Sequence, residues 1–369
     1  MKIINFTIPL GIILGIVFLY QIIQNRSNEI NFEDLALGKE TTSVYLSKVN
    51  GRVIHCGDLK DIDICLEDYN TLKVSIPVTL LLGNSQLHAI NKFLPGNETV
   101  APELHRRFFK YDEYFLTLSQ ANANLQEHYL LFAYLLNRLP IKKLALPLVF
   151  DDMREEGIRN GISDSLNDPG TIKYIVESKT GQNLINENNK ISNYDVAALE
   201  GTVQENVENI LNKNLEKIWP LWTERQKMRG TFFNYLYKVR NTLFGINPSS
   251  IRKIIPGRYA KNIESLSAIL KLASKQNIQV TLYITPLRND VKIPYDLAEY
   301  KKFKSDISLI SKQYNSKILN LENLVPAELW GSKESTSLKK TTEIDFMHFQ
   351  DGGHRLLADA LFQALVEEK

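Results

Sequence analysis

Three short apolar, β-branched runs punctuate this chain, at residues 74–83, 143–150 and 278–285. Runs of this length and composition are typical of strands that are buried on both faces of a sheet. Stretches with helical periodicity lie between them, and strands that alternate with helices form parallel sheets with right-handed crossovers. The sequence therefore predicts an α/β fold in which helices cover both faces of a parallel sheet.

Helical spacing of apolar residues is found at 124–139, 260–275 and 300–313, and again at the carboxyl end. A short strand is expected at 317–321, after the third of these helices. Residues 151–257 contain no strand run of comparable quality, and their apolar residues follow helical spacing. We therefore expect one α/β domain at 74–369 with a large helical insertion at about 151–257.

The chain begins with an apolar run from residue 3 to residue 23, which has few polar interruptions. A run of this length can cross a bilayer as a helix. A cleaved signal peptide usually has a shorter apolar core that is followed by small residues, whereas this run stays bulky to its end. We therefore expect a single transmembrane anchor at 1–25, followed at 26–73 by a stalk with a small β element.

The two cysteines, Cys56 and Cys65, lie close together in the sequence. Three interpretations are open: a disulfide, two free thiols, or a zinc site, for which only His55 and Asp58 lie nearby although zinc usually takes four ligands. The short spacing favours a disulfide, which forms in oxidising compartments. Together with the anchor, this predicts a single-pass protein of the plasma or inner membrane whose domain lies outside the cytoplasm, on the periplasmic side.

The charges are nearly balanced, with 44 basic and 42 acidic residues and a formal net charge of +2. The basic residues are spread along the chain and form no stripe that could neutralise a run of phosphates. Nucleic acid is therefore not expected as a partner.

A Gly-Asn-Ser sequence, Gly83 to Ser85, directly follows the first apolar run. A serine on a turn after a buried strand can expose its hydroxyl group while nearby backbone amides face a developing oxyanion. Small polar residues are also ordinary in turns. The serine is therefore a candidate nucleophile that needs a second observation.

The second observation is the pair Asp345 and His348, three residues apart and just before the last helix. One loop can present both side chains to a common point, where the carboxylate orients the imidazole as a general base. The alternative is that Asp345 caps a turn and His348 packs in an interface. The conjunction of this pair with the serine turn is much rarer than either alone.

With these two blocks the chain resembles the SGNH (GDSL-like) hydrolase superfamily, whose members carry Gly-Asp/Asn-Ser after the first strand and Asp-x-x-His near the carboxyl end. The resemblance implies a flavodoxin-like three-layer fold over roughly 74–150 and 260–369. It also implies a catalytic triad of Ser85, His348 and Asp345, with no metal and no cofactor.

The same resemblance implies an oxyanion hole, in which the amide of Ser85 acts with a second amide at or near Ala121. Asn122 and Asn124 could add a donor, although both could equally cap the helix that follows. The family usually has an asparagine after the next strand, whereas here that strand runs into Asp151 and Asp152.

Charged residues near the predicted strand ends are candidates for binding an anionic glycan or lipid, because arginine pairs well with carboxylate and phosphate groups. Surface ion pairs with neighbouring acids explain the arginines equally well. The candidate substrate-binding residues are Asp151, Asp152, Arg154, Arg159 and Arg288.

The organisation of the chain is similar to that of the membrane-anchored, cell-envelope acyl-transfer proteins of the superfamily, which act in teichoic acid D-alanylation or alginate O-acetylation. This similarity implies an esterase or O-acyltransferase that acts on acyl esters of a cell-envelope polysaccharide or glycolipid, in partnership with a membrane-bound O-acyltransferase. A non-catalytic scaffold for such a partner and a lipase or phospholipase are the alternatives.

Overall fold

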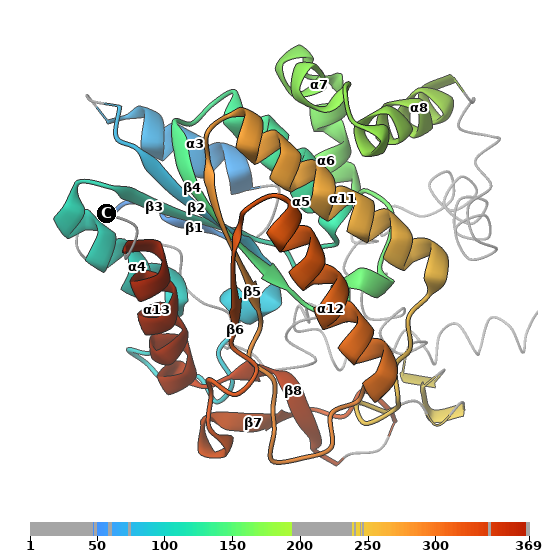
Figure 1. The fold of residues 1–369 in the computed structure, drawn as a ribbon. Helices are drawn as coiled ribbons and strands as arrows, with labels where there is room; N and C mark the ends of the chain where they lie inside the picture. Colours follow the sequence, from blue (N-terminus) through green and yellow to red (C-terminus); the bar gives the residue numbers. More distant parts are fainter. Residues whose placement is uncertain are drawn as a thin grey trace, which may run out of the picture. The chain divides into compact units, whose positions relative to one another are not determined.

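Six parallel strands form the central sheet of the protein (Figure 1). The order in the sheet is β1-β3-β2-β4-β5-β6. The strands are β1 (His55–Cys56), β2 (Val78–Gly83), β3 (Tyr114–Ser119), β4 (Ile141–Leu148), β5 (Gln279–Ile284) and β6 (Lys317–Asn320). The computed structural model describes residues 47, 50–57, 61–72, 75–193, 238–239, 241–243, 245, 247–338 and 341–366.

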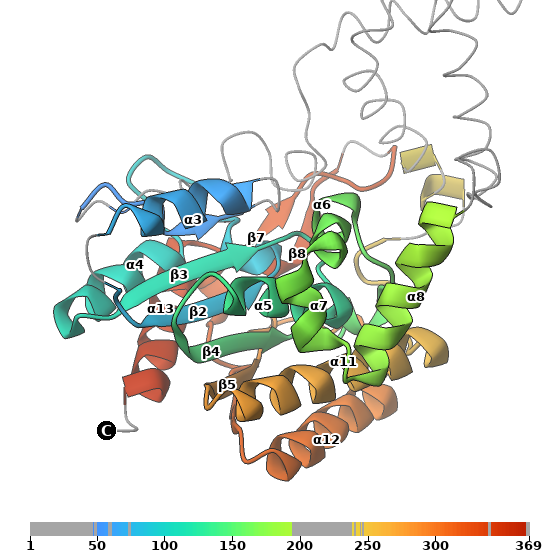
Figure 2. The same ribbon diagram turned by 90° about the horizontal axis from the view of Figure 1, so that it is seen from above.

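Helices cover the two faces of this sheet as separate layers (Figures 1 and 2). One face carries α3 (Ile62–Asn70), α5 (Leu125–Leu136), α11 (Pro256–Lys275) and α12 (Leu297–Gln313). The other face carries α4 (Val100–Phe108) and α13 (Asp351–Val366). The α/β fold with a parallel sheet predicted from the sequence is confirmed, and its three layers fit the fold that the resemblance implies.

The alternation of side chains along β2 explains why the sheet separates two cores. Leu80 and Leu82 belong to the core under α5 and α11, whereas Leu81 belongs to the core under α4 and α13. Successive side chains of a strand point to opposite faces, so a strand that is apolar throughout must be covered on both. Each of these leucines is fully buried, which is worth about 1.5–3 kcal/mol per side chain.

The segment between β4 and α11 begins with helices, as expected for the insertion. They are α6 (Asn160–Ser163), α7 (Pro169–Ile175) and α8 (Lys179–Asn193), and they pack beside α5 and α11 (Figure 2). The rest of the predicted insertion up to residue 237 lies outside the described residues.

Residues 26–73 were expected to form a stalk with a small β element. Their described part contributes the short strand β1 to the edge of the sheet and α3 to its cover. Cys56, at the end of β1, and Cys65, in α3, are joined by a disulfide bond. The pairing favoured by the sequence is therefore present, and it links an edge strand to the helix above it.

The described residues within 238–247 and 334–341 belong to a second compact unit. Within its few described residues, the Asn241 side chain donates a hydrogen bond to the Thr336 carbonyl oxygen. Among the described residues of the whole chain, no helix has the length and hydropathy needed to cross a bilayer. The anchor predicted at 3–23 lies outside them.

Candidate active site

The proposed nucleophile lies on a tight turn at the carboxyl end of β2. Ser85 begins a one-turn 3-10 helix, Ser85–Leu87, and Asn84 caps this helix by accepting a hydrogen bond from the Gln86 amide (3.1 Å). A Cβ atom on Gly83 would lie 2.2 Å from Leu87 Cδ1, so a larger residue here would displace the buried Leu87 side chain. The sequence Gly-Asn-Ser therefore builds the turn that presents the serine.

Asp345 and His348 lie on a strand, not on the loop that the sequence suggested. The strand is β8 (Glu343–Phe349), which pairs with β7 (Trp330–Lys333) in a two-stranded antiparallel sheet. Trp330 pairs with Phe349 and Ser332 with Ile344, so the ladder is interrupted by a bulge between these pairs.

The bulge brings the carboxylate and the imidazole to the same point. Side chains three apart on a regular strand face opposite sides of it. Within the bulge, Asp345 Oδ1 instead accepts hydrogen bonds from the amides of Met347 (3.0 Å) and His348 (3.1 Å), which curls the chain around the carboxylate.

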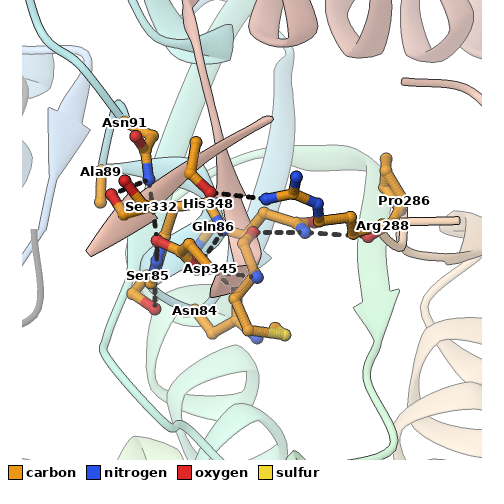
Figure 3. A network of polar contacts seen from close by, with 12 residues as sticks. Asn84, Ser85, Gln86, Ala89, Asn91, Pro286, Arg288, Ser332, Asp345 and His348 are labelled. Atoms are coloured by element: carbon orange, nitrogen blue, oxygen red, sulfur yellow. Dashed lines mark hydrogen bonds and ion pairs between the residues drawn. The ribbon is translucent and has the colours of Figure 1, made fainter. Parts of the chain in front are cut away.

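The three residues form a continuous hydrogen-bonded relay (Figure 3). His348 Nε2 lies 3.0 Å from Ser85 Oγ, and His348 Nδ1 lies 3.1 Å from Asp345 Oδ2. An ionised carboxylate can only accept, so Nδ1 carries the proton and Nε2 of the neutral ring accepts from the serine hydroxyl. This is the arrangement in which a histidine can remove the serine proton.

The electrostatics of the site keep Asp345 ionised. Its burial (0% exposed) by itself raises the pKa of the carboxyl group, but the charge and hydrogen bond of His348 and the amide of Met347 outweigh burial. The pKa of Asp345 therefore lies below its ordinary value. At neutral pH the carboxylate is available to stabilise an imidazolium ion.

Two buried amide side chains that the sequence analysis did not identify hold this relay. Gln86 Nε2 donates to the carbonyl oxygens of Met347 (2.9 Å) and Pro286 (3.1 Å), so it ties the serine turn to β8 and to the end of β5. Asn91 Nδ2 donates to Asp345 Oδ2 (3.0 Å). No sequence signal distinguishes these two side chains from the many amides that cap turns and helices.

The backbone of the second predicted oxyanion element lies next to the serine turn, because the Gln120 amide donates to the Gly83 carbonyl oxygen (2.9 Å). Ala121 and Asn122 form the turn that follows, and Asn122 adopts a left-handed conformation (φ 52°) with an exposed side chain. The amide of Ser85, as the first of a helix, has no acceptor within that helix. Backbone amides of Ser85 and Ala121 thus remain the candidate donors.

Asn124 caps a helix, which was the alternative to an oxyanion role. Its Oδ1 accepts from the amides of Gln126 and Glu127 at the start of α5, and its Nδ2 donates to the Gly157 carbonyl oxygen (2.8 Å). The Asn124 side chain therefore caps α5 and holds the loop at Gly157.

Asp152, in the turn after β4, contacts the serine turn. Its Oδ2 accepts a hydrogen bond of 2.7 Å from Asn84 Nδ2. Burial raises the pKa of Asp152 well above its ordinary value, the hydrogen bond from Asn84 lowers it, and nearby Asp151 raises it further. The carboxyl group thus fixes the residue that precedes Ser85.

The other candidate substrate-binding residues make contacts within the protein. Asp151 binds Arg252 and Tyr295. Arg154 donates to the Lys253 carbonyl oxygen (2.8 Å). These contacts connect the turn after β4 to the segment before α11 and to the loop before α12.

Arg159 and Arg288 are also engaged. Arg159 donates to the Asn122 carbonyl oxygen (2.8 Å) and to Glu127 (3.0 Å). Arg288 pairs with both carboxylate oxygens of Asp290 (2.8 and 3.0 Å) and donates to the Gly331 carbonyl oxygen (2.6 Å), close to the relay (Figure 3). Within the described ranges, no group of three or more His, Cys, Asp and Glu side chains could hold a metal ion.

The fold and site together define a serine–histidine–carboxylate relay beyond the carboxyl ends of a parallel sheet, where α/β proteins place their active sites. Neither protein-family profiles nor curated proteins match the sequence.

Among solved structures, the chain is similar to the psychrotrophic esterase EstA from Pseudoalteromonas sp. (12% identity, 79% of this chain and 98% of that chain, TM-score 0.38). It is also similar to a putative acylhydrolase from Bacteroides fragilis (9% identity, 85% and 99%, TM-score 0.38) and to an acetylxylan esterase from Geobacillus stearothermophilus (9% identity, 80% and 97%, TM-score 0.34). At this level of similarity, function must be inferred from the chain's own site.

Proposed function

We propose that this protein is a serine ester hydrolase in which Ser85 is the nucleophile, His348 the general base and Asp345 the group that orients the base. The single observation that carries the proposal is the continuous relay from Ser85 Oγ through His348 to Asp345, with both ring nitrogens at hydrogen-bond distance. Two segments far apart in the sequence meet here, and the carboxylate partner favours the histidine tautomer that proton transfer requires.

The reaction follows from this geometry. His348 Nε2 takes the Ser85 proton as Oγ attacks an ester carbonyl carbon, and the amides of Ser85 and Ala121 stabilise the oxyanion. The imidazolium, stabilised by Asp345, then protonates the departing alcohol and leaves an acyl-enzyme. A water molecule, activated by the same histidine, releases the acid and restores Ser85.

The acyl acceptor and the cellular location of the domain are also part of the proposed function. An acceptor sugar hydroxyl in place of water would turn the same acyl-enzyme into an O-acyltransferase, because both outcomes share the first half-reaction. The apolar run at 3–23 and the disulfide between Cys56 and Cys65 support a membrane-anchored domain outside the cytoplasm. The proposed substrates are therefore acyl esters of a cell-envelope polysaccharide or glycolipid.

A second candidate is a non-catalytic scaffold that binds a membrane-bound O-acyltransferase. The replacement of the usual oxyanion asparagine by Asp152 favours it, since this side chain is occupied by Asn84. Such a scaffold would not need a relay with a correctly protonated histidine, and turnover distinguishes the two.

The test is hydrolysis of p-nitrophenyl esters from acetate to longer acyl chains by the folded protein and by Ser85→Ala. We expect the Ser85→Ala variant to lose at least about a thousandfold in kcat, with thermal stability changed by less than about 1 kcal/mol. Ser267→Ala is the matched control, because Ser267 is half-buried like Ser85 but donates only to the Ile263 carbonyl oxygen in α11. Equal turnover by the wild type and Ser85→Ala would reject the enzyme and leave the scaffold.

A further inference from the structure

Asn91 is a buried amide that links the catalytic carboxylate to both strands of the β7–β8 sheet. It is 1% exposed and follows the serine turn by six residues. Its backbone amide donates to the Phe349 carbonyl oxygen (3.0 Å), at the end of the β8 bulge. Its side chain reaches into the bulge itself, where Asp345 lies (Figure 3).

Both hydrogen atoms of the Asn91 amide group are used. One is donated to Asp345 Oδ2 (3.0 Å) and the other to the Ser332 carbonyl oxygen of β7 (3.2 Å). With two acceptors in fixed directions, the amide plane cannot rotate without losing a bond in a buried place, where an unmade hydrogen bond is costly.

Asn91 and His348 contact the same oxygen atom of Asp345. Asp345 Oδ2 receives both the Asn91 amide and His348 Nδ1, whereas Oδ1 receives two backbone amides. The donor on Oδ2 therefore acts on the same oxygen that orients the histidine. It disperses part of the negative charge that this oxygen presents to the ring.

Gly331 makes room for this contact. A Cβ atom at Gly331 would lie 1.8 Å from Asn91 Oδ1, so any larger residue at this position would displace the amide. The same Gly331 carbonyl oxygen is held by Arg288 from the other side. The strand opposite the bulge is thus clamped between an arginine and the asparagine.

We propose that Asn91 is a positioning residue that fixes the orientation and the charge of Asp345, and through it the proton affinity and direction of the His348 ring. The proposal rests on the proposed serine hydrolase function for its kinetic consequences. Its structural core, the coupling of Asn91 to His348 through Asp345, is measurable without turnover.

The expected effect has a definite sign. Without the Asn91 donor, Oδ2 presents more negative charge to His348, which favours the imidazolium ion. The ring then holds its proton to higher pH, and a protonated ring cannot accept the proton of Ser85. The low-pH limb of the kcat/KM profile should shift to higher pH, by roughly half a pH unit to one unit.

The experiment compares Asn91→Leu, which removes the donor at similar volume, with Gly331→Ala, which leaves Asn91 intact and pushes its amide away. We expect both to lower kcat roughly 10- to 100-fold with KM nearly unchanged. Proton NMR of the His348 ring, identified by its absence in His348→Ala, should show a titration midpoint at higher pH in both variants.

Asn262→Leu is the matched control. Asn262 is a buried amide (0% exposed) that accepts from the Leu125 amide and donates to the carbonyl oxygens of Glu155 and Arg258, away from the relay. This variant should lose stability without moving the His348 midpoint.

An unchanged His348 midpoint in folded Asn91→Leu and Gly331→Ala would overturn the proposal, even if activity fell. If the wild type hydrolyses no ester but the midpoint moves, the positioning role stands and the proposed function fails. If Asn91→Leu does not fold, Gly331→Ala alone decides, because it keeps the Asn91 side chain and displaces it from Asp345.

Discussion

Amide side chains, more than additional charged groups, hold the proposed catalytic residues in place. Asn84 joins the serine turn to Asp152, Gln86 joins it to β8, and Asn91 holds the carboxylate. Gln86 and Asn91 each donate both side-chain N–H hydrogens to acceptors of two elements, and Asn84 donates one while its oxygen accepts another, all without a buried net charge.

The Asn84 and Asp152 pair allows an exchange experiment. Asn84→Asp alone places two carboxyl groups at the 2.7 Å separation of the present hydrogen bond, in a buried place. We therefore expect it to lower both the free energy of unfolding and kcat strongly. Adding Asp152→Asn restores a donor opposite an acceptor, with the roles reversed. The double variant should therefore recover at least about tenfold in kcat over Asn84→Asp, a coupling of roughly 1.4 kcal/mol.

The coupling is measured as a double-mutant cycle of kcat and of unfolding free energy. Asp152→Asn alone keeps an acceptor oxygen, so it should change kcat and the free energy of unfolding little. Additive effects of the two substitutions would show that the contact does not position Ser85.

At the scale of elements, the three apolar runs predicted β2, β4 and β5, because strands buried on both faces must be largely apolar. The edge strand β6 was expected from its place after a helix. The β3 strand, Tyr114–Ser119, was missed, since its threonine and final serine weaken the apolar run although every residue is buried. The β1 strand is too short to show a period. Both are fixed by neighbours in the sheet, and β1 also by the disulfide, which are tertiary effects that a local pattern does not carry.

The site residues likewise fall into those that local motifs predicted and those that depend on the folded chain. Ser85, Asp345 and His348 were predicted because each lies in a short local motif, and the structure brings all three together. Asn91 was not predicted, because its role exists only where the β8 bulge faces Gly331 across another strand. The candidate substrate-binding arginines were plausible from their place after strands, but their partners within the protein are set by the folded chain.

At the scale of the whole molecule, buried histidines make stability depend on pH. Burial lowers the pKa of His55 well below its ordinary value, with a contribution from nearby His88. Burial, together with the charge of Arg159, lowers the pKa of His128 to about 3, and burial lowers that of His354 to about 3. The unfolded chain binds these protons near pH 6.5, whereas the folded chain does not.

Because the unfolded state binds more protons below this value, stability should fall as the pH drops from about 6.5 towards 5, by up to about 1.4 kcal/mol per pH unit for each histidine. The lowered pKa of Asp345 adds a loss only in more acidic solution, below about pH 4. Urea unfolding at pH 7.5 and 5.5 measures the effect. His128→Gln should reduce the slope by about one proton, and a stability that is flat over this range would contradict the buried, neutral histidines.

The central claim is that the hydroxyl group of Ser85 is an activated nucleophile. The most direct measurement is reaction of the folded protein with a fluorophosphonate, followed by intact mass and peptide mapping. We predict a single phosphonyl adduct on Ser85, which is absent in Ser85→Ala and forms far more slowly in His348→Ala. No adduct on the wild type, or an adduct that persists unchanged in Ser85→Ala, would contradict the account.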